Sequence, residues 1–387
     1  MNDIIYLDNS ATSFPKPEEV YSFMNSFYRK RGVSPGRTGF DAAIETEEMV
    51  GNTRRMLMEL FNGDGDPNRL TFSYNASDSL NMIIQGLARK GDHVISTMLE
   101  HNSVLRPLHH LEIDGTIEVT YVPFDSRTGY VNPDDIQKAI KKNTRMVVMN
   151  HCSNVIGTVQ PVGEVGKICK EAGVLFVVDG SQSAGAVEVD MQRMGIDAFC
   201  FTGHKCLMGP TGIGGSYVMK GVEVRHTRFG GTGVRSAQKT HLDEYPYRLE
   251  CGTLNLLGVA GLHAGVKWIL NEGIANLHNR EMDLWERLVN GVKDIENVTT
   301  YCALGRENKN PVLSLNVKGF ESGDVGTMLD VDYNIACRTG LQCAPKVHEV
   351  IGTDKIHGTV RLSIGAFTTQ EHVDKAIQAI KEIASLR

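Results

Sequence analysis

The sequence predicts an α/β fold in which a large domain with a mostly parallel sheet is joined to a smaller α+β domain. Between residues 69 and 205, short apolar runs alternate with helical patterns, which is typical of a parallel α/β sheet. The run 174–178 is continuously apolar, as expected for a parallel strand that is buried on both faces. Because ligands of such sheets bind at the carboxyl ends of the strands, we expect the functional residues there.

The composition is that of an ordinary globular protein that can bury a large core. Its 387 residues suggest about two to three domain equivalents, with 41% hydrophobic and 22% charged residues. The net charge of −6 gives no reason to expect nucleic acid as a partner. The N-terminus shows no signal-peptide pattern and no apolar run reaches membrane-span length, so we expect no membrane. Eight scattered cysteines argue against a disulfide framework or a metal site, and they favour a reducing cytoplasm.

Before the main sheet we expect one strand and two helices, at 4–7, 18–28 and 42–61. Pro17 precedes the first helix, where proline is tolerated because the first N–H groups of a helix lack intrahelical acceptors. The glycine- and aspartate-rich stretch 62–67 ends the second helix. The loop 34–39 carries Arg37, which we interpret as a solvated surface arginine.

The main sheet is predicted from seven apolar runs, at 69–73, 93–97, 116–122, 145–150, 174–178, 198–201 and 215–218. Helical patterns at 133–141 and 162–172 lie between some of these runs. After the first run, Asn75 can cap a helix and Asp78 can reach back toward it. A strand that leads directly into a helix start also forms an anion site from free N–H groups. The cap and the anion site are compatible, and we keep both interpretations.

The C-terminal part of the chain begins after a loop-rich segment at 221–250. Its expected helices and strands lie at 256–270, 274–292, 312–317, 335–338, 359–364 and from Glu371 onward. Together they predict a small α+β domain. We therefore expect a large domain at 16–262 and a small domain made of 1–15 together with 263–387.

Lys205 and Asp179 point to a specific chemistry. Lys205 follows the strand 198–201 in the turn Thr-Gly-His-Lys, where an unpaired lysine is costly unless its amine is used. An amine with a lowered pKa can bond covalently to an aldehyde, although a solvated loop is the plainer interpretation of this turn alone. Asp179 ends the neighbouring apolar run, 26 residues earlier. A carboxylate that keeps a pyridinium nitrogen protonated, beside a lysine that holds an aldehyde, fits pyridoxal phosphate.

The chain resembles the class V aminotransferase fold, and within it the cysteine desulfurases and selenocysteine lyases. The motifs that carry this resemblance are Tyr-Leu-Asp-Asn-Ser-Ala-Thr at 6–12, Asn-Ala-Ser at 75–77, Glu-His-Asn at 100–102, His-Cys-Ser-Asn-Val-Ile-Gly-Thr at 151–158, Asp-Gly-Ser-Gln at 179–182, Thr-Gly-His-Lys at 202–205, Gly-Thr-Leu-Asn at 252–255 and Arg-Thr-Gly-Leu-Gln-Cys-Ala-Pro at 338–345. The resemblance covers nearly the whole chain. It implies a pyridoxal 5'-phosphate enzyme of the aspartate aminotransferase-like architecture, fold type I.

The resemblance also implies roles for residues at the strand ends. His101 would stack on the pyridoxal ring and relay protons, whereas a lone histidine without this resemblance is more often structural. Asn154 would lie near the 3′-oxygen of the cofactor and the substrate carboxylate. The implied cofactor-binding residues are Ala76, Ser77, His101, Asn154, Asp179, Gln182, Thr202, His204 and Lys205. Thr253 would reach the phosphate bound by the other subunit of a homodimer.

The loop at 338–345 carries the implied nucleophile, Cys343. A cysteine is nucleophilic only when it is accessible and deprotonated, and its position before Ala-Pro in a loop favours exposure. Cys152, in contrast, is interpreted as buried packing. The implied substrate-binding residues are Asn154, Arg338 and Arg361, because an arginine beside a cleft can clamp a carboxylate through two parallel hydrogen bonds.

The chain departs from the family pattern at Gln342. Related enzymes often carry histidine just before the catalytic cysteine, and glutamine is neither an acid nor a base. If that histidine assists deprotonation of the thiol in relatives, another group must act here. The candidates are His101, His348 and bulk solvent.

These observations predict a cysteine desulfurase that converts L-cysteine to L-alanine and forms a persulfide on Cys343, with Lys205 and His101 as further catalytic residues. A selenocysteine lyase, or another pyridoxal phosphate-dependent C–S lyase on this fold, is the alternative, and sequence does not separate them. The alternative outside the enzymes is a non-catalytic module that binds sulfur-acceptor proteins. A protein of this kind would need no cofactor. We expect a homodimer, with a sulfur-acceptor protein as a possible partner, and no bound metal.

Overall fold

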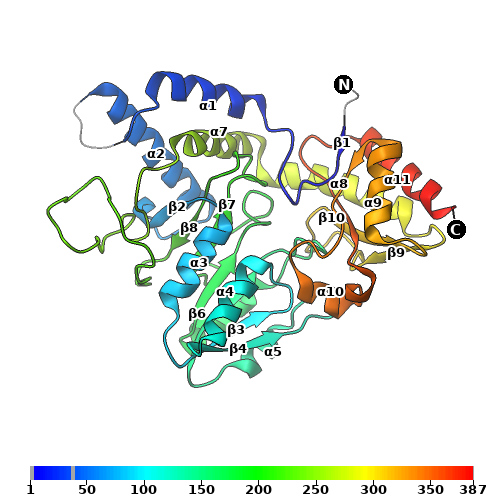
Figure 1. Cartoon of the computed structure of the whole chain (residues 1–387), viewed down its shortest axis with the longest axis horizontal. Coiled ribbons are helices and arrows are strands. Elements are labelled where there is room, and N and C mark those ends of the chain that lie inside the picture. Colours follow the sequence, from blue (N-terminus) through cyan, green and yellow to red (C-terminus); the bar gives the residue numbers. More distant parts are fainter. Residues whose placement is uncertain (1–3, 36–39, 387) are drawn as a thin grey trace.

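The computed structural model describes residues 4–35 and 40–386 and is built around a seven-stranded sheet (Figure 1). In spatial order the strands are β2 (Leu70–Ser73), β8 (Gly214–Val218), β7 (Ala198–Thr202), β6 (Leu175–Asp179), β5 (Thr144–Asn150), β3 (Asp92–Thr97) and β4 (Ile117–Val122). Strands β4, β3, β5, β6 and β7 pair in parallel, whereas β8 is antiparallel to both of its neighbours. The predicted mostly parallel sheet is confirmed, with β8 as the reversed strand.

Helices cover both faces of this sheet. The helices around it are α2 (Asp41–Leu60), α3 (Ala76–Leu87), α4 (Asn102–Ile113), α5 (Pro133–Ala139), α6 (Val162–Ala172) and α7 (Leu256–Glu272). In β6, Phe176 and Val178 belong to the core shared with α2, α6 and α7, while Val177 belongs to the core shared with α3 and α4. Figure 1 shows α3 and α4 side by side on one face. Because both faces are covered, β6 is apolar at each position from Leu175 to Val178 rather than at alternate ones.

Both ends of the described part of the chain lie in the smaller part of the molecule (Figure 1). Its elements are β1 (Ile5–Tyr6), α8 (Ile274–Val292), β9 (Val298–Tyr301), β10 (Val312–Val317), α9 (Ser322–Tyr333), β11 (Ile335–Ala336), α10 (Pro345–Ile351), β12 (Val360–Ser363) and α11 (Gln370–Ala384). Strands β12, β10 and β9 form an antiparallel sheet, and β1 pairs with β11 in parallel. Ile5 and Leu7 share one apolar core with Trp285, Leu362 and Ile380. Ile5 and Leu7 thus pack against C-terminal elements, and the predicted domain division stays a prediction.

The ends of two helices place polar groups at the edge of the main sheet. The Asn75 side chain accepts a hydrogen bond of 3.0 Å from the Asp78 N–H, so the predicted cap of α3 is confirmed. Asp78 reaches back to the Tyr74 N–H instead of the Asn75 N–H. Helix α4 was not predicted, because its cap is His101, which is an unusual cap residue, and because Pro107 lies inside it.

Three further facts bear on the sequence predictions. Helix α1 spans Glu18–Arg31 and packs against α7, so the helix predicted after Pro17 is present. Arg37 lies outside the described residues. No helix within 4–35 and 40–386 is both long enough and apolar enough to cross a membrane.

Candidate active site

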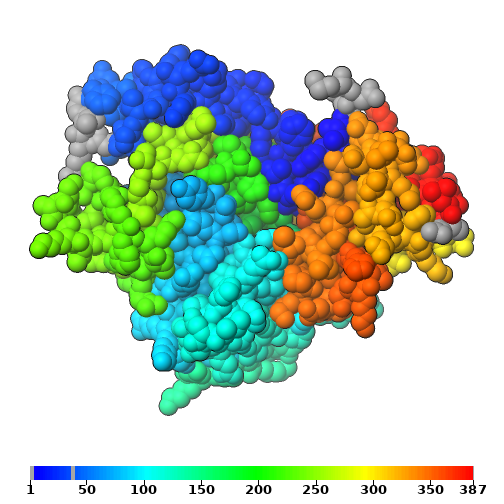
Figure 2. All heavy atoms as spheres, viewed as in Figure 1, coloured from blue at the N-terminus to red at the C-terminus, as the bar shows by residue number. Residues whose placement is uncertain are grey.

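A cleft with a volume of about 370 Å³ lies where β5, β6 and β7 end. The predicted site residues that line it are Ala76, Ser77, His101, Asn154, Asp179, Gln182, Thr202, His204, Lys205, Arg338, Cys343 and Arg361. They come from the large sheet, from two helix starts and from the C-terminal part of the chain. Figure 2 shows how the C-terminal contribution is made, because the orange segment around 340–350 lies against the cyan segment around 100–115.

Asp179 and Lys205 lie at the carboxyl ends of neighbouring parallel strands. Asp179 is the last residue of β6 and pairs in register with Cys200 of β7, and Lys205 follows β7 by three residues. Asp179 is 4% exposed, and its Oδ1 accepts a hydrogen bond of 2.9 Å from the Ser181 N–H. Burial lowers the pKa of Lys205, and the charge of Asp179 opposes this shift. The site therefore holds a fixed carboxylate and a lysine amine that loses its proton more readily than a solvated one.

The start of α3 lies where the sequence predicts an anion site. Ala76 and Ser77 occupy the first turn of α3, where backbone N–H groups have no intrahelical acceptor. The Ser77 Oγ lies 2.5 Å from the Ser103 Oγ at the start of α4. A Cβ added at Gly214 would lie 2.7 Å from the Asn75 Cα, so only glycine allows β8 to approach this helix start. Two hydroxyls and a helix start thus face the same end of the cleft.

His101 joins α4 to the cleft. Its Nδ1 accepts a hydrogen bond of 3.1 Å from the Ser103 N–H. Since a backbone N–H only donates, the proton of the neutral imidazole is on Nε2. Burial lowers the pKa of His101 to about 4, and the nearby Lys205 amine adds to the shift. His101 is therefore a neutral imidazole near pH 7, held in one tautomer by its cap.

Arg361 is fixed by a carboxylate that the sequence analysis did not identify. The Arg361 side chain is 3% exposed, and its Nη2 donates a hydrogen bond of 2.7 Å to the Asp8 Oδ1. Its Nη1 donates a hydrogen bond of 2.9 Å to the Asn154 carbonyl oxygen. Asp8 precedes Arg361 by 353 residues, so no local pattern links them. The sequence offered only a general signal for this pair, which is that an arginine buried in the fold requires a nearby acceptor or anion.

Cys343 is exposed at the rim of the cleft in a tightly held turn. Both Gln342 and Cys343 have positive φ angles, of 43° and 58°, in the left-handed region that non-glycine residues seldom adopt. The Cys343 carbonyl oxygen accepts a hydrogen bond of 2.7 Å from the Asn102 N–H of α4. The Asn154 side chain donates a hydrogen bond of 2.8 Å to the Gln342 carbonyl oxygen. These bonds hold the strained turn and keep the thiol at the cleft.

Gln342 serves as an anchor for this turn. Its side chain is buried, and its Nε2 donates a hydrogen bond of 2.8 Å to the Thr359 carbonyl oxygen. His348 is also buried, and its Nδ1 lies 2.7 Å from the Thr353 Oγ1. It does not line the cleft, and burial lowers its pKa to about 4. Of the two histidines considered as replacement bases, His101 is the one that lines the cleft with Cys343.

Glu100 is a fully buried carboxyl next to the site that the sequence analysis also missed. Its Oε1 accepts hydrogen bonds of 2.6 Å from the Thr97 Oγ1 and 3.0 Å from the Asn150 N–H. Its Oε2 has no partner among the described residues. Burial raises the pKa of Glu100 to about 8, and the charge of Asp179 contributes to the rise. Glu100 is therefore mostly protonated at neutral pH and adds no second negative charge beside Asp179.

The pKa of Glu100 makes stability depend on pH. Between the pKa of an unfolded glutamate, about 4.3, and the folded value of about 8, the folded chain keeps a proton that the unfolded chain loses. The free energy of unfolding therefore falls as pH rises through this window. Glu100→Gln imitates the protonated acid, so we expect its Tm to exceed that of the wild type by ~4 °C at pH 9.

Calorimetry at pH 5 and pH 9 tests this expectation. At pH 5 the two proteins should melt at similar temperatures, because wild-type Glu100 is then largely protonated in the folded state. Glu59→Gln, a change at an exposed glutamate, is the control and should leave the pH dependence unchanged. A Glu100→Gln protein that is less stable than the wild type at both pH values would contradict the assignment.

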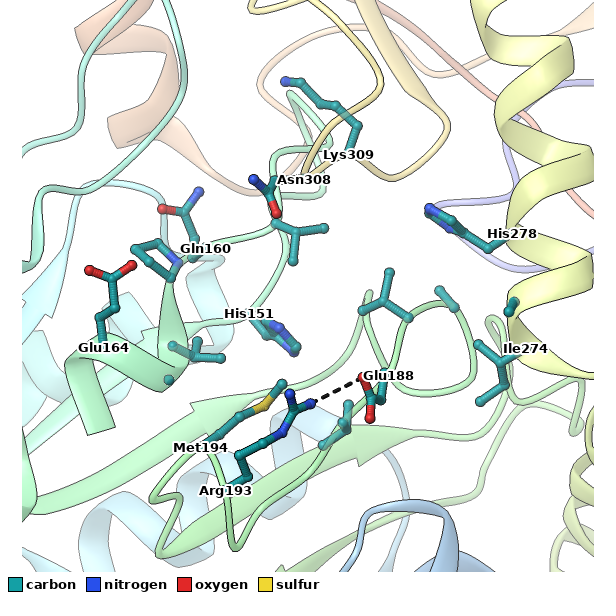
Figure 3. A pocket seen from close by; sticks show the side chains of 18 of the residues that line it. His151, Gln160, Glu164, Glu188, Arg193, Met194, Ile274, His278, Asn308 and Lys309 are labelled. Atoms are coloured by element: carbon teal, nitrogen blue, oxygen red, sulfur yellow. Dashed lines mark ion pairs between the residues drawn. The ribbon is translucent and has the colours of Figure 1, made fainter. Parts of the chain in front are cut away.

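Two other hollows do not contain the predicted cofactor residues of the cleft. Thr253 is exposed and lines a hollow of about 450 Å³ together with Gly231 and Glu250, so it is separate from the cleft of its own chain. A larger hollow of about 840 Å³ is lined by His151, His278, Glu188, Arg193 and Lys309 (Figure 3). In it, Arg193 and Glu188 form an ion pair of 3.1 Å. Its size alone does not make it the candidate site, because the lysine, the carboxylate and the exposed thiol line the smaller cleft.

Comparison with known proteins agrees with this arrangement. The family described as aminotransferase class-V matches residues 5–376. A probable cysteine desulfurase of Methanothermobacter thermautotrophicus is 31% identical over 391 residues, covering 100% of this chain and 96% of that protein. A probable cysteine desulfurase of Pyrococcus abyssi is 33% identical over 394 residues, with the same 100% and 96% coverage.

Solved structures show the same relationship. The apo form of a cysteine desulfurase from Thermococcus onnurineus NA1 is 31% identical to this chain and aligns with a TM-score of 0.93. The alignment covers 100% of this chain and 96% of that one. Since the family match and these relatives span almost the whole sequence, the chain belongs to the class V aminotransferase family and has the fold type I architecture.

Proposed function

We propose that this chain is a pyridoxal phosphate-dependent cysteine desulfurase, which converts L-cysteine to L-alanine and forms a persulfide on Cys343. The observation that carries the proposal is the exposed Cys343 thiol on the same cleft as Lys205, Asp179 and Arg361. The relatives described above support it, since they are named cysteine desulfurases or probable cysteine desulfurases.

The polar groups of the cleft fit pyridoxal phosphate. Thr202 Oγ1, His204 Nδ1 and Asn150 Oδ1 are buried atoms without a partner among the described residues. Such atoms are unfavourable unless a ligand or water bonds to them. The residues that would hold the cofactor are Ala76 and Ser77 at its phosphate, His101 at its ring face, Asp179 at its ring nitrogen, Lys205 at its aldehyde, and Asn154, Gln182, Thr202 and His204 around it.

The bound cofactor supplies an electron sink for charge that develops at the α-carbon of the substrate. Asp179 stabilises the positive ring nitrogen on which that sink depends, because its carboxylate is fixed and largely shielded from water. Lys205, with its lowered pKa, takes the α-proton of the substrate and later returns a proton. His101 is neutral and carries its proton on Nε2. It can therefore donate a hydrogen bond from Nε2 without adding a positive charge to the cleft.

Cys343 and Arg361 act on the substrate itself. Arg361 binds the substrate carboxylate, with Asn154 holding the guanidinium in place through its carbonyl oxygen. The Cys343 thiolate attacks the sulfur of L-cysteine, so that an S–S bond forms while the Cβ–S bond of the substrate breaks. The thiol of Cys343 and L-cysteine thus become the Cys343 persulfide and L-alanine, with all atoms conserved.

Release of alanine from L-cysteine and from L-selenocysteine tests the proposal. We expect alanine from L-cysteine, a persulfide on the protein, and visible absorbance from bound pyridoxal phosphate. Turnover of L-selenocysteine but not of L-cysteine would point to a selenocysteine lyase. Turnover of L-cysteine without a persulfide on the protein would point to another C–S lyase. Protein that shows no cofactor absorbance even after addition of pyridoxal phosphate would be a binding module instead.

Arg361→Lys is expected to raise the KM for L-cysteine by roughly tenfold or more, because lysine cannot reproduce the two parallel hydrogen bonds of a guanidinium. The turnover number should change less, since Arg361 binds the substrate and does not move a proton. Steady-state kinetics measures both values. The matched control is Arg287→Lys, an exposed arginine paired with Asp374, and it should leave the KM unchanged. An unchanged KM in Arg361→Lys would contradict the carboxylate role.

We also propose a homodimer that works in the cytoplasm. Thr253 is exposed and lies outside the cleft of its own chain, which leaves it available to the phosphate of a partner subunit. A reducing compartment keeps Cys343 as the free thiol that the reaction requires. Analytical ultracentrifugation tests the dimer, and a sedimentation coefficient of a monomer would contradict it.

A further inference from the structure

We propose that Asp8 is a specificity-determining residue that masks one of the two arginines of the cleft, so that a single carboxylate is bound. The substrate named in this inference rests on the proposed desulfurase function, but the anion binding that tests it does not. Asp8 does not line the cleft, whereas Arg338 and Arg361 do. The carboxylate therefore acts on the ligand through the two arginines.

Each oxygen of Asp8 holds a different guanidinium. Oδ1 accepts from Arg361 Nη2 at 2.7 Å, and Oδ2 lies 2.8 Å from Arg338 Nη2. The backbones of the two arginines are also paired, with N–H to O=C distances of 3.1 Å and 2.7 Å. The arginines are thus neighbours across an antiparallel bridge, and one carboxylate between them keeps the two positive side chains together.

The two arginines differ in their freedom to move. The Arg361 side chain is 3% exposed and is also bonded to the Asn154 carbonyl oxygen, whereas the Arg338 side chain is 50% exposed. The Arg361 Nε is buried and has no partner among the described residues. A ligand carboxylate that accepts from Arg361 therefore satisfies a donor that is otherwise unpaired. Arg338 shares Asp8 with Arg361, but its half-exposed side chain can also be solvated by water.

The charges of this cluster explain the expected selectivity. Arg338 and Arg361 carry two positive charges and Asp8 carries one negative charge, which leaves one positive charge to attract one substrate carboxylate. If Asp8 becomes neutral, Arg338 loses its ion-pair partner and becomes a second site for an anion. Asp8→Asn is therefore expected to bind oxyanions more tightly than the wild type does.

Sulfate binding, measured by calorimetry, tests this inference. Asp8→Asn should bind sulfate about tenfold more tightly than the wild type, because one additional charge-assisted contact forms. The gain should disappear in the double variant Asp8→Asn with Arg338→Gln. Asp374→Asn is the matched control, because it removes the carboxylate from another arginine pair outside the cleft, and its sulfate affinity should equal that of the wild type. A purely structural role for Asp8 predicts weaker sulfate binding, not tighter binding.

Two outcomes would overturn the inference. One is a folded Asp8→Asn protein with unchanged or weaker sulfate binding. If Asp8→Asn does not fold, Arg338→Lys decides, because lysine keeps the positive charge beside Asp8 and removes only the guanidinium, so sulfate affinity should stay within about twofold of the wild type. The second outcome that would overturn the inference is a tenfold loss in Arg338→Lys, which would show that the Arg338 guanidinium already binds the anion. Absence of alanine release by the wild type would overturn the desulfurase proposal but not the inference about Asp8, since sulfate binding is measured independently on the same proteins.

Discussion

Lys205→Ala is expected to abolish release of alanine from L-cysteine, with a loss of at least about 10⁴-fold in turnover. Lys205 is the amine of the cleft that lies beside Asp179, and burial lowers its pKa. The variant removes the group that we propose both to hold the cofactor covalently and to move the α-proton. It should still bind pyridoxal phosphate, but weakly, because the proposed phosphate site at the start of α3 is intact.

Lys309→Met is a matched control for this prediction. Lys309 is also a buried lysine, with a pKa lowered by burial to about 8, but its Nζ donates to the Ile156 carbonyl oxygen and the Thr158 Oγ1. It lines the larger hollow of Figure 3, so its loss should spare the chemistry. Borohydride reduction and peptide mapping should attach the cofactor to Lys205 in the wild type. Attachment to any other lysine would make the central assignment wrong.

Cys343→Ala is expected to eliminate desulfuration of L-cysteine while the visible absorbance of the bound cofactor stays that of the wild type. Cys343 is the exposed thiol of the cleft, and it is carried by the turn that also contains Gln342. Its loss removes the sulfur acceptor but none of the residues proposed to hold the cofactor. Alanine release and the absorbance spectrum are measured on the same preparation.

Cys152→Ala is the matched control, because Cys152 lines the same cleft but is buried. Burial raises the pKa of the Cys152 thiol to about 12, so it remains a thiol and is a poor nucleophile. We expect Cys152→Ala to keep its activity and to carry the persulfide on Cys343. Mass spectrometry after turnover locates the persulfide. A persulfide on Cys152, Cys206 or Cys251, or full activity in Cys343→Ala, would favour a plain C–S lyase.

The structure changes the interpretation of Gln342. From sequence, its importance lay in the histidine that it replaces and in the base that was therefore missing. In the fold, its amide is buried and bonded to Thr359, so its position supports the geometry of the turn. His101 lines the same cleft, but its Nδ1 is occupied by the Ser103 N–H and its Nε2 carries the proton, so deprotonation of Cys343 is left to solvent, to which the thiol is exposed.

The sequence by itself determined the elements whose signals are local. Continuous apolar runs identify buried parallel strands, and the polar residues that end them, Asp179 and Lys205, must meet at one edge of the sheet. Asn75 after a strand likewise marks the start of α3, since capping uses groups within a few residues of each other. These inferences hold because strand direction and helix ends follow from neighbouring residues.

Only the tertiary structure decided which distant residues share the cleft. The pairing of Asp8 with Arg361 spans 353 residues, and Glu100 is bonded to Asn150 of β5 while the charge of Asp179 on β6 helps to raise its pKa. The positive φ angles of Gln342 and Cys343 are maintained by bonds to α4 and Asn154, which lie elsewhere in the sequence. Hydrophobic periodicity reports which face of an element is buried but not what packs against it. Charge pairing and pKa shifts therefore appear only when the segments are assembled in space.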